Sequence, residues 1–190
     1  MKTASRKAQL MQIAAKVFSR EGYTETNIES ISNEAGMTGP AIYRHFSSKQ
    51  QILDTICVSG IESALEAARE IYGRKGANPE ETLKKLIESR IDHSFGPMSA
   101  SFLLAASQKA HLSHAAREKV SVMQREFRDI CGSLLRKIKP EADEVELKAA
   151  VFAVQCMNTY TTWQYKDRDL LTEEELKLLL QRINWHTLLG

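Results

Sequence analysis

Cysteine is scarce in this sequence, and its few occurrences form no recognisable pattern. Cys57, Cys131 and Cys156 are far apart and odd in number, so neither a disulfide framework nor a CxxC metal site is indicated. We expect all three to be small apolar core residues. A thiol redox sensor is the alternative role for them.

Long hydrophobic runs are also missing. No apolar stretch approaches the ~18–20 residues that a membrane-spanning helix needs. The first ten residues are polar and include Lys2, Arg6 and Lys7, with no apolar stretch behind them, unlike a secretory signal. We therefore expect a cytoplasmic protein without a membrane partner.

The motifs of common enzyme classes are absent as well. The sequence has no glycine-rich phosphate loop, no recognisable nucleophile arrangement and no paired-carboxylate motif. His93, His111 and His114 lack tight metal-ligand spacing apart from one weak i, i+3 pair, so surface or core histidines are expected. We predict that the protein is not an enzyme and has no metal and no cofactor.

Helical periodicity is what the sequence does contain. Apolar residues recur at i, i+3, i+4, i+7 and i+8 from Leu10 to Phe18, whereas no stretch alternates with the period of a strand. The expected helices are one that ends at Gly22, one from Thr26 or Asn27 to Gly36, one from Thr38 to near Phe46, and six over about 48–71, 79–94, 99–110, 114–137, 142–165 and 172–185. The predicted fold class is all-α with about nine helices.

Charge is distributed unevenly along the chain. Residues 1–50 hold seven Lys or Arg against four Glu, a net charge of +3, whereas the other 140 residues have a net charge of −1. A basic N-terminal segment followed by a near-neutral remainder is typical of a protein that contacts nucleic acid near one end. We predict a DNA-binding domain over residues 1–49 and a larger helical domain over residues 50–190.

The segment 26–49 has the order of elements of a helix-turn-helix. Two short helices flank a tight turn at Gly36–Met37, and a longer helix precedes them. Glycine suits that turn because it has no side chain to clash there. Ile31, Ile42 and Phe46 are among the apolar residues that would bury one side of the pair.

Over residues 8–56 the sequence resembles the TetR family of one-component transcriptional regulators. The matching positions are Thr26, Ile31, Ala35-Gly36-Met37, Thr38, Ile42-Tyr43, Phe46, Lys49 and Ile52-Leu53. Ser32 stands where the family usually has alanine, which is a minor departure. The resemblance implies an N-terminal three-helix DNA-binding domain and a C-terminal helical domain for ligand binding and dimerisation.

Candidate DNA contacts lie around the second and third helices. Helix N-termini and hydroxyls suit phosphate oxygens, and arginine or small side chains can read base edges in the major groove. The candidates are Thr26, Thr38, Gly39, Ala41, Tyr43, Arg44, His45 and Lys49. Five of them have another role open to them: Tyr43 as an aromatic at the core edge, Lys49 as a solvated surface lysine, and His45, Thr26 and Thr38 as helix caps.

The larger domain offers candidates for a ligand pocket and a dimer interface. A mostly apolar set with a few polar tips suits an apolar ligand, although such residues are also ordinary core. The pocket candidates are His93, Phe95, Met98, Phe102, Met123, Phe127, Met157, Tyr160 and Trp163. The interface candidates on the last two helices are Val151, Val154, Gln155, Leu176, Leu179, Leu180 and Ile183.

The function that the resemblance implies is ligand-controlled transcriptional regulation. The expected partners are double-stranded DNA, a second copy of the chain and a small-molecule effector of unknown identity. A homodimer would place two recognition helices on a palindromic operator, and a mostly apolar effector would release them. The alternative is a helical interaction module, or a regulator without a small-molecule ligand.

Overall fold

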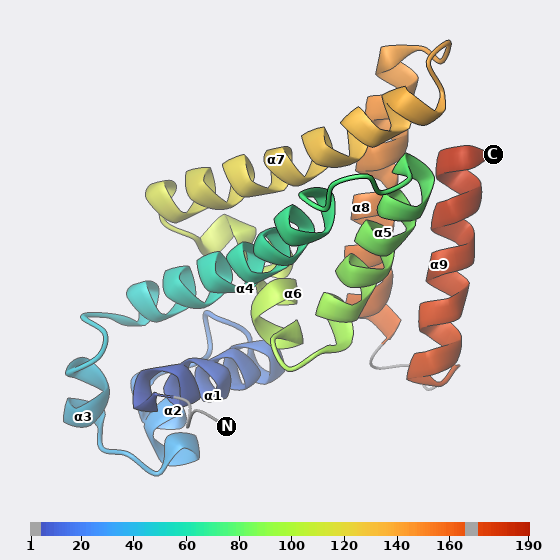
Figure 1. Ribbon diagram of the computed structural model, residues 1–190. Helices are drawn as coiled ribbons and strands as arrows, with labels where there is room; N and C mark the ends of the chain where they lie inside the picture. Colours follow the sequence, from blue (N-terminus) through green and yellow to red (C-terminus); the bar gives the residue numbers. More distant parts are fainter. Residues whose placement is uncertain (1–4, 166–170) are drawn as a thin grey trace. The chain divides into compact units, whose positions relative to one another are not determined.

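The computed structural model describes residues 5–165 and 171–190, with the side chain of Trp163 left out of the description. Over these residues the protein is all-α, as predicted, with nine α-helices and one 3-10 turn (Figure 1). The elements are α1 (Arg6–Glu21), α2 (Ile28–Ala35), α3 (Gly39–Tyr43), α4 (Lys49–Tyr72), α5 (Pro79–Phe95), α6 (Ser99–Ser107), η1 (Lys109–His111), α7 (His114–Ile138), α8 (Glu144–Tyr165) and α9 (Glu173–Leu189).

Local capping explains where several helices begin. Asn27 and Ser30 form a reciprocal capping box at the start of α2, so Asn27 is the cap rather than Thr26. Asn78 caps α5, with Pro79 in the first turn, where its missing N–H costs nothing. The predicted capping box of Thr172 and Glu175 opens α9.

Three boundaries differ from those predicted. The third helix, expected to end near Phe46, ends at Tyr43. The helix expected over residues 99–110 ends at Ser107, and η1 follows it as a separate 3-10 turn. The last helix continues to Leu189 instead of ending near Trp185. The polar connection predicted over residues 166–169 lies outside the described residues.

The chain divides into two compact units, each assembled from two stretches of sequence. Unit 1 comprises residues 1–61 and 98–121, and unit 2 comprises residues 62–97 and 122–190. The helices α4 and α7 each contribute residues to both units. Whether the functional boundary falls at residues 49 and 50 stays a prediction.

Unit 1 contains α1, α2, α3 and α6 around a closely packed apolar interior. Phe18, Ile31 and Ile42 are fully buried there. The α4 and α6 backbones approach so closely at Gly60 that a Cβ atom would lie 2.6 Å from the Ser101 carbonyl carbon. Only glycine fits this crossing without a shift of the main chain.

Unit 2 is built on α5, α8 and α9, which pack against one another (Figure 1). Leu83, Leu86 and Ile91 of α5 are fully buried, and Leu180 of α9 is nearly so. No helix among the described residues is long and apolar enough to cross a bilayer. The described residues also contain no cluster of three or more His, Cys, Asp or Glu placed to hold a metal ion.

Candidate functional site

The helix-turn-helix of unit 1 is formed by α2, α3 and the turn between them. Gly36 adopts the left-handed conformation with φ of +58° at the end of α2, which a residue with a side chain rarely does. The Met37 amide donates to the Ser32 carbonyl oxygen at 2.9 Å and closes the turn. Ile42 and Phe46 are buried beneath α3, so the opposite side of this short helix is left at the surface.

The predicted DNA contacts from residue 38 to 45 lie together on that surface. Thr38 and Arg44 are exposed, and Tyr43 is exposed over 54% of its area, which excludes the core-edge role for it. Gly39, Ala41 and His45 are half-buried. No acidic residue occurs between positions 38 and 49, so anionic phosphates would meet no like charge from this segment.

Thr26 does not belong to this exposed group. Its side chain is buried, and its Oγ1 donates to the Gly22 carbonyl oxygen at 2.7 Å. The hydroxyl thereby fastens the turn between α1 and α2 instead of capping α2. The interpretation of Thr26 as a helix cap with a hydroxyl facing phosphate is corrected by this burial.

Lys49 occupies a place that the sequence did not indicate. Its Nζ donates to the carbonyl oxygens of Tyr23, Thr24 and Thr26 at 2.8, 3.3 and 2.7 Å, and it lies 4.5 Å from the centroid of the Tyr23 ring. An ammonium group has three donors, so these carbonyls use all of them. Lys49 is therefore neither a solvated lysine nor a group poised toward solvent, because it holds the α1–α2 loop on the start of α4.

A hydrogen-bond network within unit 1 extends this anchor. The Tyr23 hydroxyl donates to Gln50 Oε1 at 3.0 Å, and Gln50 Nε2 donates to the His111 carbonyl oxygen at 2.8 Å. Asp54 accepts from Gln50 and from the Ser113 amide, both at 3.0 Å. The α1–α2 loop and the start of α4, which flank the helix-turn-helix, are thus tied to residues 111–113, far along the chain. Burial, and next the charge of Asp54, raise the pKa of Tyr23 above its usual value.

The predicted pocket residues are divided between the two units. Met98 and Phe102 belong to unit 1, whereas the other candidates belong to unit 2. Within unit 2, Met123 and Phe127 are buried, His93, Phe95 and Met157 are half-buried, and Tyr160 is exposed over 62% of its area. The Trp163 side chain lies outside the described part of the chain.

An internal cavity of unit 2 lies among α5, α7, α8 and α9, with a volume of about 10 Å³. Of the predicted set, Phe127 contributes to its wall. The polar side chains in the wall are Arg90, Gln155 and Asn158, all of them buried. Sequence reasoning missed Arg90, because an arginine within an amphipathic helix is normally a surface residue.

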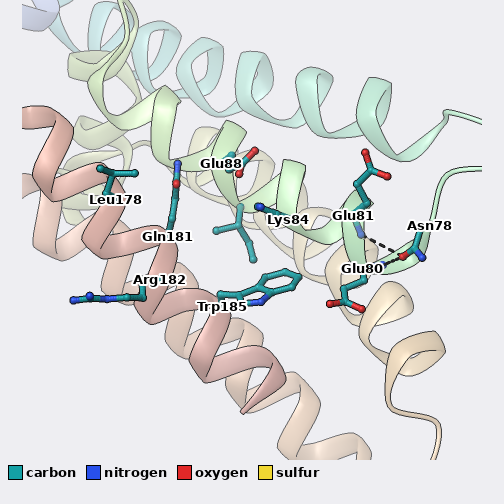
Figure 2. A pocket seen from close by; sticks show the side chains of 10 residues that line it. Asn78, Glu80, Glu81, Lys84, Glu88, Leu178, Gln181, Arg182 and Trp185 are labelled. Atoms are coloured by element: carbon teal, nitrogen blue, oxygen red, sulfur yellow. Dashed lines mark hydrogen bonds between the residues drawn. The ribbon is translucent and has the colours of Figure 1, made fainter.

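A much larger hollow of about 570 Å³ opens between α5 and α9 (Figure 2). The Trp185 indole forms part of its wall, together with Ile87 and Leu178. Glu80, Glu81, Lys84, Glu88 and Arg182 surround this apolar strip. The groove is a surface feature of unit 2 with mixed charges, and it contains none of the predicted pocket residues.

Most of the predicted dimer residues lie on the inner sides of α8 and α9. Val151, Val154, Gln155, Leu176 and Leu180 are buried within unit 2 itself, Leu179 is half-buried, and Ile183 is exposed. The first five residues therefore form the core of the unit and leave almost no surface to offer a partner. The burial of these five residues corrects the predicted choice of the interface face on α8 and α9.

The exposed apolar side chains of α8 and α9 lie elsewhere. Val145, Phe152 and Tyr160 recur on α8 at intervals of seven and eight residues, which places them along one side of the helix. Cys156 is exposed between them, contrary to the expectation that it belongs to the core. Leu178 and Ile183 are exposed on α9.

Comparisons with known proteins agree with the helix-turn-helix. Residues 10–56 match the family described as "Bacterial regulatory proteins, tetR family". The HTH-type transcriptional repressor KstR2 of Rhodococcus jostii is 28% identical over 136 residues, which cover 70% of this chain and 64% of that protein. The match thus spans less than two thirds of that relative's length.

Solved structures share the fold at low sequence identity. The ketosteroid transcriptional regulator KstR2 of Mycobacterium tuberculosis has a TM-score of 0.82 at 19% identity, covering 97% of this chain and 95% of its own. AibR, in complex with isovaleryl coenzyme A and operator DNA, has a TM-score of 0.80 at 19% identity, covering 94% of this chain and 97% of its own.

The fold and the exposed turn define a protein of the helix-turn-helix class. The resemblance predicted from residues 8–56 is confirmed by the family match and by the related regulators. Over residues 10–56 the chain matches the TetR family, and the KstR2 relatives named above are described as transcriptional regulators.

Proposed function

We propose that the protein is a transcriptional repressor, with a binding rather than a catalytic role, that acts on DNA in the cytoplasm. The observation that carries this proposal is the exposed, acid-free surface from Thr38 to His45 on a well-capped helix-turn-helix. Arg44 and Tyr43 are its longest exposed side chains. Arginine reads guanine by a bidentate pair of hydrogen bonds, and a tyrosine hydroxyl reaches phosphate.

The proposed contact set is narrower than the sequence suggested. Thr38, Gly39, Ala41, Tyr43, Arg44 and His45 remain in it. Thr26 and Lys49 act indirectly in this proposal, by holding the loop from which α2 starts. The short side chains at positions 39 and 41 leave much of the specificity to the shape of the DNA.

Selection of bound sequences from a random double-stranded DNA pool tests this proposal. The wild type should enrich a palindrome, and Arg44→Ala should weaken binding and change the preferred base at its position. The matched control is Arg74→Ala, which removes the same charge from an exposed site in unit 2. Absence of enrichment by the wild type at low salt, or equal losses in the two variants, would contradict it.

The palindrome follows from the proposal that the repressor is a homodimer. We assign its interface to the exposed side of α8 and α9, where Phe152, Tyr160, Leu178 and Ile183 would be covered by the second copy. Exposed aromatic and aliphatic side chains are typical of such interfaces. Phe152→Glu should yield monomers in sedimentation, with Glu146→Gln on the same helix as a control that stays dimeric.

We also propose that a small effector with an apolar part releases the DNA. The names of the similar structures support this class of ligand, because one is a ketosteroid regulator and another holds isovaleryl coenzyme A. The helices α4 and α7 have residues in both units and are the route that we assign to the response. By linkage, the effector has to bind the DNA-free form more tightly.

A further inference from the structure

Arg90 is an arginine in the interior of unit 2. It projects from α5, it is 5% exposed, and its guanidinium lies 4.5 Å from the centroid of the Phe127 ring. Burial lowers the pKa of Arg90 to about 10, so the group is still a cation at neutral pH. The other groups that shift this pKa are the Cys131 and Cys156 thiols, which raise it, and the Arg128 guanidinium, which lowers it. Burying such a charge is costly, and residues that impose this cost are often functional.

Two buried amide side chains line the same cavity as Arg90, and their oxygens accept hydrogen bonds from other groups. Gln155 Oε1 accepts from Arg128 at 3.0 Å, and Asn158 Oδ1 accepts from Asn184 Nδ2 at 2.6 Å. The opposite end of each amide is an NH₂ donor. Arg90, Gln155 and Asn158, which all line this cavity, therefore each carry N–H donors.

The rest of that wall is apolar. Ile87, Val151, Val154 and Leu188 line the cavity beside the three polar side chains. Its volume of about 10 Å³ is room for roughly one water molecule. A larger ligand would therefore have to open the site by moving side chains, as ligands do at pockets that are closed in the free protein.

We propose that this cluster is the recognition point for a carboxylate at the end of an apolar effector, with Arg90 as the ion-pairing residue and Gln155 and Asn158 as further donors. A carboxylate only accepts hydrogen bonds and matches a guanidinium in a bidentate manner. The apolar wall would contact the body of the same molecule. The inference rests on the proposed effector response and names the chemical class of that effector.

The test uses the full chain and pairs of probes that differ only in charge. Hexanoate, decanoate and palmitate are each compared with their primary amides, and stabilisation is followed by thermal unfolding and affinity by calorimetry. At least one carboxylate should stabilise the wild type more than its amide does. Arg90→Met should weaken binding of that carboxylate roughly ten- to a hundredfold while leaving binding of the amide unchanged.

Substitutions in the cavity wall distinguish a loss of carboxylate recognition from a loss of folding stability. Arg90→Met in the absence of ligand should melt at the wild-type temperature or above it, because an apolar side chain replaces a buried charge. Gln155→Leu provides a second, uncharged change in the same wall. Arg69→Met, an exposed arginine of unit 2, is the control and should keep the full preference for the carboxylate.

Equal stabilisation by acids and amides, no response to any carboxylate, or an unchanged preference in both cavity variants would overturn the inference. DNA binding, measured beside these titrations, keeps the two proposals apart. A wild type that binds its operator but shows no carboxylate preference rejects only the anion site. A wild type that prefers the carboxylate but enriches no DNA rejects only the proposed repressor.

Discussion

The two units of the molecule distribute polar and apolar side chains in different ways. In unit 1 the large apolar residues are inside, and Tyr43 is its single large hydrophobic side chain that is exposed among the described residues. In unit 2 the polar residues Arg90, Gln155, Asn158 and Asn184 are buried, whereas Phe152 and Tyr160 are among those exposed.

This difference indicates where each unit would bind its partner. The exposed segment from Thr38 to His45 has no acidic residue, which suits a phosphate backbone, so we expect unit 1 to bind its partner at its surface. A polar interior and an apolar surface each carry a cost in an isolated domain. In unit 2 the proposed effector would relieve the first cost by binding in the interior. The second copy of the chain would relieve the other cost by covering the exposed side of α8.

The largest expected effect comes from the tightest contact in unit 1. Gly60→Ala should lower the free energy of unfolding by roughly 1–3 kcal/mol, because the added methyl group meets main-chain atoms that cannot move aside. Gly132→Ala in α7 is the matched change, since nothing lies within 4 Å of a Cβ there. It should stabilise by up to about 1 kcal/mol through helix propensity. Denaturant titration gives the free energy of unfolding of both variants. Equal effects of the two substitutions would refute the close approach of α4 and α6 at Gly60.

A substitution of Lys49 should affect the free energy of unfolding more than the electrostatic part of DNA binding. Lys49→Met removes three hydrogen bonds to loop carbonyls and should cost about 1–3 kcal/mol of unfolding free energy. The control, Lys16→Met, changes an exposed lysine of α1. If Lys49 instead bound phosphate directly, the variant would keep its stability and lose about one unit of slope in the salt dependence of DNA affinity.

The rates at which the three cysteines are alkylated distinguish the interior of the units from the proposed interface. Burial raises the pKa of both Cys57 and Cys131 to about 12, so these thiols are protonated and should react slowly with alkylating reagents at neutral pH. Cys156 is exposed and should react first. In a dimer through α8 its labelling should be slow, and Phe152→Glu should accelerate it. Fast labelling of wild-type dimers would place the interface elsewhere.

The smallest effect is expected at an exposed ion pair of unit 2. Arg69 Nε donates to Glu126 at 2.7 Å, and this hydrogen bond lowers the pKa of the Glu126 carboxyl below its usual value. A carboxyl whose pKa is lower in the folded state adds stability above its unfolded pKa and loses it as the pH falls. Glu126→Gln should therefore melt slightly earlier than the wild type near neutral pH and together with it in acid. High salt should erase the difference at neutral pH.

The sequence was sufficient for the features that depend on neighbouring residues. Apolar periodicity and caps predicted the helices, and Gly36 predicted the turn, because each is decided within a few positions along the chain. Lys49 and Arg90 were beyond such reasoning, since their surroundings come from distant segments. On α8 the face could not be chosen, because Val151 and Phe152 make both sides of the helix apolar.

The network of Tyr23, Gln50 and Asp54 has a consequence for engineering. A chimera that exchanges the DNA-binding domain at a single point in the sequence would break this network. A graft of residues 10–56 alone would leave behind the His111 carbonyl and the Ser113 amide, to which Gln50 and Asp54 are bonded. The transplantable part of this protein is therefore discontinuous, and a chimera should carry residues 98–121 with it.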